Sequence, residues 1–120
     1  MSLTAPALHA RTSSSFEAKL ARATAVLTSA AAEHGSRIVQ APSLGAEDMV
    51  ITDLVARKHL AVTIGTLDTG VLHAETLALL ARIESHYGLQ VEVMQPRREA
   101  VVHFVALHGE RAMYESIDLR

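Results

Sequence analysis

Short apolar runs alternate with helical patterns along most of this chain, and this alternation limits its possible folds more than any other feature. Each run has the length of a strand, and each is followed by a segment whose apolar residues recur every three or four positions. The runs lie at 37–41, 60–66 and 89–94, and the helical segments at 47–58, 74–86 and 98–107. Strands and helices in this order predict right-handed crossovers onto a parallel sheet. We therefore predict an α/β fold, an open parallel sheet of about three strands with helices on both faces.

The chain before the first run divides into two parts. Residues 1–13 are mostly small or polar and include Pro6, a composition typical of a flexible tail. From Ser15 the pattern predicts an amphipathic helix that ends at Gly35. Its apolar positions are Phe16, Leu20, Ala23, Leu27 and Ala30. We therefore expect a tail over 1–13 and one α/β domain over 14–120.

Composition excludes several classes of protein. The 120 residues contain no Trp, two Phe and two Tyr, so an aromatic platform for stacking nucleic-acid bases is not expected. A formal charge of −2 provides no overall basic field for nucleic acid or anionic membrane. No apolar run approaches the 18 residues of a membrane span, and we predict a cytoplasmic protein. With no Cys, the chain offers no disulfide, no thiolate metal site and no cysteine nucleophile.

In an open parallel sheet, ligands bind beyond the carboxyl ends of the strands, where helices begin with free N–H groups. The first loop at that edge is formed by Ser43, Leu44, Gly45, Ala46, Glu47 and Asp48. Its small residues would let backbone amides approach an anion. The alternative is a plain strand-to-helix turn, with Ser43 or Asp48 capping the helix.

The second segment at that edge is formed by Leu67, Asp68, Thr69 and Gly70. Asp68 and Thr69 can orient the loop by bonding its amides, and Gly70 permits a left-handed turn. Turn chemistry alone would also explain this segment. Neither segment fits the dinucleotide pattern G-x-G-x-x-G or the phosphate loop that ends in GKS or GKT. The seven His residues suggest no metal site, and no catalytic arrangement is legible.

Two motifs in these segments resemble the adenylyl-sulfate and phosphoadenylyl-sulfate reductase family. They are SLGAEDMVITDL and, further along, TLDTGVLHAETLALLARIESHYGLQVEVMQP, and the similarity runs from about residue 37 to 120. The resemblance implies an adenine nucleotide alpha-hydrolase-like fold of the PP-loop type, with 14–120 as a partial nucleotide-binding domain. Residues 43–48 would then hold the phosphosulfate, and residues 67–70 the adenosine, with backbone groups of Leu67 bonding the base.

The resemblance also implies an activity that this chain cannot perform alone. In the family, a cysteine near the carboxyl terminus attacks the sulfate sulfur, and thioredoxin or glutaredoxin then releases sulfite. The products are sulfite and AMP or adenosine bisphosphate, in sulfate assimilation and cysteine biosynthesis. Because the chain has no Cys, we predict a fragment of such a reductase that is inactive alone. It would carry no cofactor, although members that reduce adenylyl sulfate hold a 4Fe-4S cluster.

Two residues depart from the family pattern within the matched motifs. Pro42 stands where members commonly have Ser or Thr, which removes a hydroxyl and an amide donor. Val71 stands where many members have Arg, which removes a cation. Both changes should weaken nucleotide binding. The GAED form of the first loop is more similar to the adenylyl-sulfate type.

Two other functions remain open alongside the reductase fragment. One is a non-catalytic module that binds adenine nucleotides. The other is an ATP-pyrophosphatase-type relative, although such enzymes typically have an SGG-type loop and residues 43–46 do not match it. If the sheet ends after three strands, the strand that would sit in the middle of a complete sheet has one unpaired edge, which favours pairing with another chain. We therefore expect a homo-oligomer.

Overall fold

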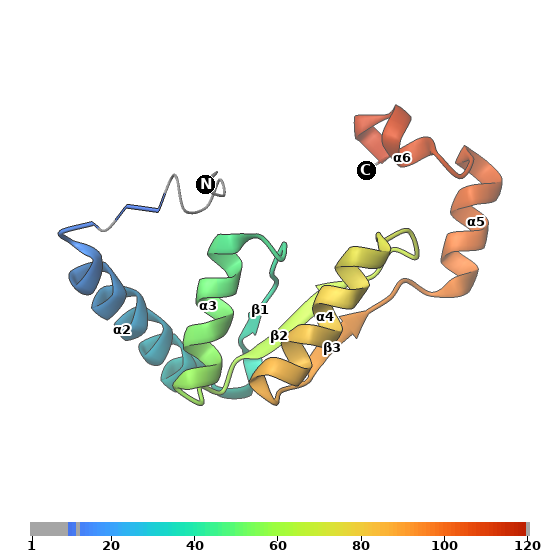
Figure 1. The fold of residues 1–120 in the computed structure, drawn as a ribbon. Helices are drawn as coiled ribbons and strands as arrows, with labels where there is room; N and C mark the ends of the chain where they lie inside the picture. Colours follow the sequence, from blue (N-terminus) through green and yellow to red (C-terminus); the bar gives the residue numbers. More distant parts are fainter. Residues whose placement is uncertain (1–9, 12, 120) are drawn as a thin grey trace.

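A computed structural model describes residues 10, 11 and 13–119, and the predicted tail over 1–13 lies largely outside these residues. The predicted strands and helices are present, although the strands are shorter than expected (Figure 1). The elements are α2 (Phe16–His34), η1 (Gly35–Arg37), β1 (Val39–Gln40), α3 (Ala46–Arg57), β2 (Thr63–Leu67), α4 (Ala74–Tyr87), β3 (Val91–Met94), α5 (Arg98–His108), α6 (Ala112–Glu115) and η2 (Ile117–Leu119).

The three strands form a parallel sheet in the order β1-β2-β3, as the alternation of runs and helices predicted. Helices α3 and α4 pack against one face of this sheet. Five buried residues from both helices and two strands form the core: Val55, Ile64, Leu80, Ile83 and Val91. Because Ile64 and Val91 are register partners, their side chains lie on the same face and join the two crossover units into one core. The α/β class is therefore confirmed.

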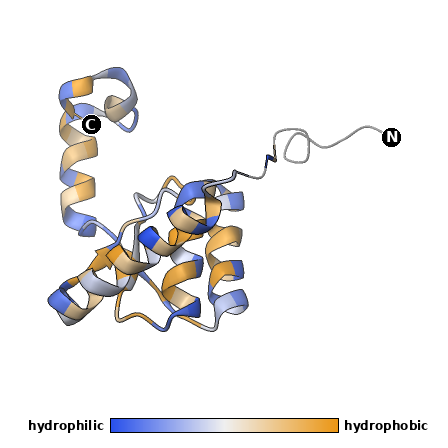
Figure 2. Ribbon diagram, turned by 90° about the vertical axis from the view of Figure 1, so that its left-hand side faces the viewer, coloured by the Kyte–Doolittle hydropathy of each residue, from blue (hydrophilic) through white to orange (hydrophobic). Residues whose placement is uncertain are grey.

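The opposite face of the sheet has little cover among the described residues. Side chains of Val39, Leu67 and Met94 on this face are 48%, 68% and 38% exposed. The next helix along the chain, α5, stands away from the sheet in both views and has no buried residue (Figures 1 and 2). Within the described chain, α3 and α4 therefore cover one face, and the helix expected on the other face is not packed there.

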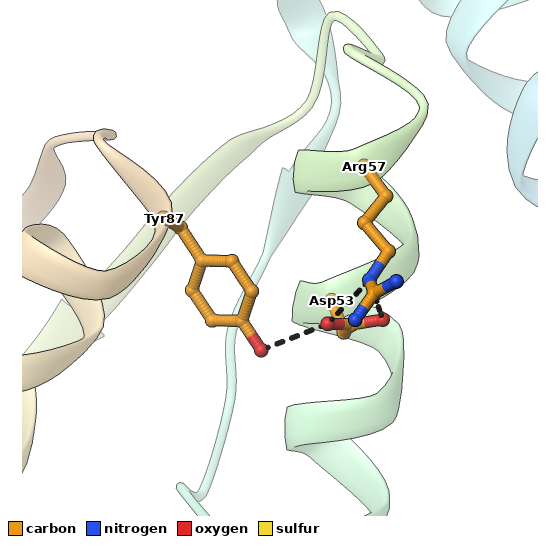
Figure 3. Close-up of polar contacts among 3 residues, drawn as sticks. All are labelled: Asp53, Arg57 and Tyr87. Atoms are coloured by element: carbon orange, nitrogen blue, oxygen red, sulfur yellow. Dashed lines mark hydrogen bonds and ion pairs between the residues drawn. The ribbon is translucent and has the colours of Figure 1, made fainter.

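Polar contacts tie the two covering helices together (Figure 3). The Tyr87 hydroxyl at the end of α4 donates to Asp53 Oδ1 on α3 over 3.1 Å. Arg57 Nε lies 2.8 Å from Asp53 Oδ2, one helical turn further along α3. Burial, and then the hydrogen bond and charge of Asp53, raise the pKa of Tyr87 above its ordinary value of 10.0. The carboxylate thus accepts from both helices at once.

Replacing Tyr87 by phenylalanine is expected to lower the free energy of unfolding by about 0.5–1.5 kcal/mol, because one hydrogen bond is lost while Asp53 keeps Arg57. The raised native pKa means that the phenol contributes stability fully below pH 10, and that this contribution is lost as the pH rises through the native pKa. Urea unfolding of both proteins at pH 8 and above pH 10 measures this. Equal stability at pH 8 would contradict the expectation.

Candidate functional site

The loop between β1 and α3 is folded around a carboxylate of its own. Asp48, in the first turn of α3, accepts from both the amide and the hydroxyl of Ser43, each over 2.6 Å. Leu44 has a φ of 66°, which few non-glycine residues adopt, and Gly45 then starts α3 with extended backbone. Gly45 is the N-cap residue of α3, and as a glycine it has no side chain with which to cap the helix. The expectation that Ser43 or Asp48 caps the helix is therefore wrong; Asp48 instead organises the turn before the helix, and the Ser43 donors face this carboxylate.

Gln40 and Thr52, which the sequence analysis did not single out, hold this loop through hydrogen bonds to the Asp48 backbone and to each other. Gln40 on β1 donates through Nε2 to the Asp48 carbonyl over 2.9 Å. The Thr52 hydroxyl lies 3.2 Å from Gln40 Oε1 and 3.1 Å from the same carbonyl oxygen. Thr52 is only 1% exposed, so its hydroxyl donates its hydrogen bond within the protein and not to water. A polar residue at a strand end and a Thr one helical turn after Asp48 were the only sequence signals for these contacts.

Protonation of the Asp48 carboxylate should change the NMR resonance of the Ser43 amide that donates to it. Donation by the hydroxyl, and then by the amide, of Ser43 lowers the pKa of Asp48 below its ordinary value of 3.8. The bonded loop is therefore fully formed above pH 3.8 and is lost as the pH falls through the lower native pKa. We expect the Ser43 amide resonance to titrate with a midpoint below 3.8. In Asp48→Asn that titration should vanish; its persistence would assign the shift to another group.

The turn after β2 is held by a second aspartate. Asp68 accepts from the Gly70 amide over 2.8 Å and from Gln95 Nε2 over 3.0 Å. These two bonds, that of Gly70 first, lower the pKa of Asp68. The Asp68 amide donates to the Met94 carbonyl over 2.9 Å, and Gly70 has a φ of 84°. The turn chemistry expected of Asp68 and Gly70 is present, and it ties this turn to the end of β3.

The two loops border one pocket of about 460 Å³ at the carboxyl ends of the strands. Of the predicted site residues, only Ser43, Leu44 and Leu67 line it. The others lie beside the pocket without lining it: Gly45, Ala46, Glu47, Asp48, Asp68, Thr69 and Gly70. The lining that the sequence did not indicate is Ala41, Gly65, Thr66, Leu72, Thr76 and Met94. Most of these are apolar or small, so the pocket suits a flat ring better than a charged group.

The two departures from the family pattern take different positions. Pro42 is buried and lines the pocket, so the proline ring contributes apolar surface where a hydroxyl would be polar. Val71 is 59% exposed and lies outside the pocket lining. None of the lining residues is Lys or Arg. The donors available to an anion here are therefore backbone amides and the hydroxyls of Ser43, Thr66 and Thr76.

The described residues provide no clustered metal ligands. No group of three or more His, Asp or Glu side chains in the described ranges could hold a metal ion. A 4Fe-4S cluster requires cysteine thiolates, and the chain has none. No helix in the part of the chain that the structure describes is long and apolar enough to cross a membrane.

A comparison with known protein families shows to which family the domain with this pocket belongs. Residues 37–119 match the phosphoadenosine phosphosulfate reductase domain. This chain belongs to that family. The match takes in both loops and all three strands, so the phosphoadenosine phosphosulfate reductase domain contains the whole pocket. Helix α2 lies before the matched residues.

Several relatives are similar to this chain over two thirds or more of its length. Adenosine 5'-phosphosulfate reductase from Neisseria meningitidis serogroup A is 54% identical over 81 residues, which are 67% of this chain and 33% of that protein. The protein of the same name from Burkholderia cepacia is 41% identical over 103 residues, 86% of this chain and 41% of the relative. That from Allochromatium vinosum is 45% identical over 83 residues, 69% and 32% respectively. The chain thus spans about a third to two fifths of the length of these relatives.

Proposed function

We propose that this chain is the nucleotide-binding portion of an adenylyl-sulfate reductase in sulfate assimilation. The observation that carries the proposal is the pocket bordered by both loops, within a domain of the reductase family. The adenine ring would enter between Leu44, Leu67 and Leu72, with backbone groups of Leu67 bonding its edge. The phosphosulfate would lie over residues 43–48, at the positive end of α3.

Binding at that loop requires an exchange of hydrogen-bond partners. The Ser43 amide and hydroxyl now donate to Asp48, and an incoming phosphate oxygen would compete for them. Glu47 and Asp48 in the first turn of α3 add negative charge near the phosphates. We therefore expect the adenosine part to provide most of the affinity of this chain. The phosphosulfate would gain its cationic partners from outside these 120 residues.

The reductive step would use a cysteine from outside this chain. Its thiolate would attack the sulfate sulfur of adenylyl sulfate and form an S–S bond, while the bond from sulfur to the phosphate oxygen breaks and AMP leaves. A dithiol such as thioredoxin or glutaredoxin would then release sulfite and be oxidised to a disulfide. In this scheme the present chain binds and orients the nucleotide, and we place the protein in the cytoplasm.

Calorimetric titration of the 120-residue chain tests the proposal. Adenylyl sulfate should bind saturably, phosphoadenylyl sulfate and AMP should bind within about tenfold of it, and GMP should bind far more weakly, because the base supplies the affinity. A chain shown by circular dichroism to be folded, but giving no saturable heat with any adenine nucleotide, would contradict the proposal.

A non-catalytic adenine-nucleotide-binding module is the second candidate, favoured by the complete absence of Cys. Both candidates predict nucleotide binding, but they differ in what happens next. If the chain serves a reductase, adding a polypeptide that contains the family's cysteine-bearing region should restore sulfite release from adenylyl sulfate and thioredoxin. Binding without any restored release would favour the module.

A further inference from the structure

Thr66 on β2 is a buried polar residue that lines the nucleotide pocket. It is 8% exposed, and its hydroxyl makes no hydrogen bond to the residues that the structure describes. No fully enclosed polar side-chain atom in this part of the chain lacks a partner, so the Thr66 hydroxyl is reached from outside. The opening that Thr66 lines is the pocket, and its hydroxyl is therefore available to a ligand there.

Thr52 shows what a buried threonine does when the protein itself provides the partners. Its hydroxyl bonds Gln40 and the Asp48 carbonyl. Buried polar groups in proteins are bonded in the great majority of cases, because an unbonded one has lost its contacts with water without replacement. The contrast between the two threonines points to a partner for Thr66 that arrives with a ligand.

The surroundings of the Thr66 hydroxyl are apolar. Side chains alternate along a strand, so Thr66 lies on the same face as Ile64, whose side chain belongs to the core under α3 and α4. Leu44, which packs against that core, and Leu72, which precedes α4, line the pocket with it. Thr66 is the most deeply buried polar side chain of the pocket, since Ser43 is exposed and Thr76 is half-buried.

A single buried hydroxyl between apolar side chains suits one polar group on a flat ring. It does not suit the phosphates, which carry several charged oxygens and which we assign to the exposed loop at 43–48. The amino edge of adenine fits better, because its 6-amino group donates hydrogen bonds and a threonine oxygen accepts them. The ring itself would lie against the leucine side chains.

We propose that Thr66 is a specificity-determining residue of this pocket, whose hydroxyl oxygen accepts a hydrogen bond from the 6-amino group of adenine. The inference rests on the proposed nucleotide site and adds a side-chain contact to the backbone contacts assigned to Leu67. Because Thr66 and Leu67 are adjacent in the chain, both are placed to meet one edge of the same ring.

Calorimetric titration of Thr66→Val tests this contact, because valine keeps the shape of threonine and removes only the hydroxyl. The two ligands are AMP and purine riboside 5'-monophosphate, which has a hydrogen atom in place of the 6-amino group. The variant should bind AMP about tenfold more weakly than the natural chain does, the effect of one lost hydrogen bond. Its affinity for the purine nucleotide should stay within about twofold. Thr63→Val, on the same strand outside the pocket, should change neither affinity.

Thermal unfolding separates recognition of the base from a structural role. Thr66→Val should unfold at the same temperature as the natural chain or above it, whereas Thr52→Val removes a bonded hydroxyl and should unfold at a lower temperature. Equal weakening of both nucleotides, with a lowered unfolding temperature, would assign a structural role to Thr66 and overturn the proposal. An unchanged preference for AMP would overturn it too, while leaving the proposed function intact. A natural chain that binds no adenine nucleotide would contradict the proposed function, and this inference with it.

Discussion

Replacing Leu80 by alanine is expected to lower the free energy of unfolding by about 2–5 kcal/mol, the cost of removing a large buried side chain and leaving a cavity. Leu80 is 8% exposed and belongs to the cluster that joins α3, α4 and the sheet. Helix α5 has no buried residue and adds nothing to this cluster, so the stability of the described residues depends on the core that contains Leu80. A loss of this size is a large part of the stability of a small domain. Urea unfolding followed by circular dichroism measures it.

Leu77 on the same helix provides the matched control. It is 48% exposed, so Leu77→Ala removes the same atoms from a site that water already reaches. The change in unfolding free energy should stay within about 0.5 kcal/mol. If both variants lost the same stability, the cluster around Leu80 would not be the core of this protein.

Gly45→Asp is expected to weaken binding of adenylyl sulfate by about 100-fold. A Cβ at Gly45 would lie 3.3 Å from Glu47 Oε2 and 3.4 Å from Ser43 Oγ, beside the loop to which we assign the phosphosulfate. A carboxylate there would repel the phosphate, and at about 6 Å two like charges near a protein surface repel by roughly 3 kcal/mol, which corresponds to about a 100-fold loss of affinity. The φ of Gly45 is −71°, which any residue adopts, so the backbone should not change. Calorimetric titration checks the loss.

Asparagine at the same position separates charge from size. Gly45→Asn has nearly the same volume as Gly45→Asp but carries no charge, and it should bind adenylyl sulfate within about fivefold of the natural chain. If asparagine weakened binding as much as aspartate, crowding of the loop would be responsible. If neither variant weakened binding, the nucleotide would lie elsewhere.

The sequence was most informative where a local pattern repeats. Leu77, Leu80 and Ile83 recur on one predicted stripe of α4. Leu80 and Ile83 are buried, whereas Leu77 is 48% exposed. The helix boundaries at Gly35 and Gly109 follow from the ability of glycine to take a positive φ. The strands were less well placed: the first was expected over 37–41 but pairs only at Val39 and Gln40. An apolar run does not tell where pairing stops, because pairing depends on the neighbouring strand.

For the candidate site, the sequence located both loops but not the pocket between them. Ser43, Leu44 and Leu67 were expected and line it, while Leu72, Thr76 and Met94 line it without any sequence signal. Met94 reaches the pocket only because β3 lies beside β2, whereas Leu72 and Thr76 follow the second loop along the chain.

The sequence by itself determined the α/β class, the parallel sheet and the family, because these depend on periodicity and on motifs that are local in the chain. Only the tertiary structure decided which face of the sheet α3 and α4 cover, and that α5 packs on neither. It alone showed that Gln40 and Thr52 hold the first loop, and that α2 and α3 leave an open groove. The physical reason is that these features depend on distances between segments far apart in sequence, which no local pattern specifies.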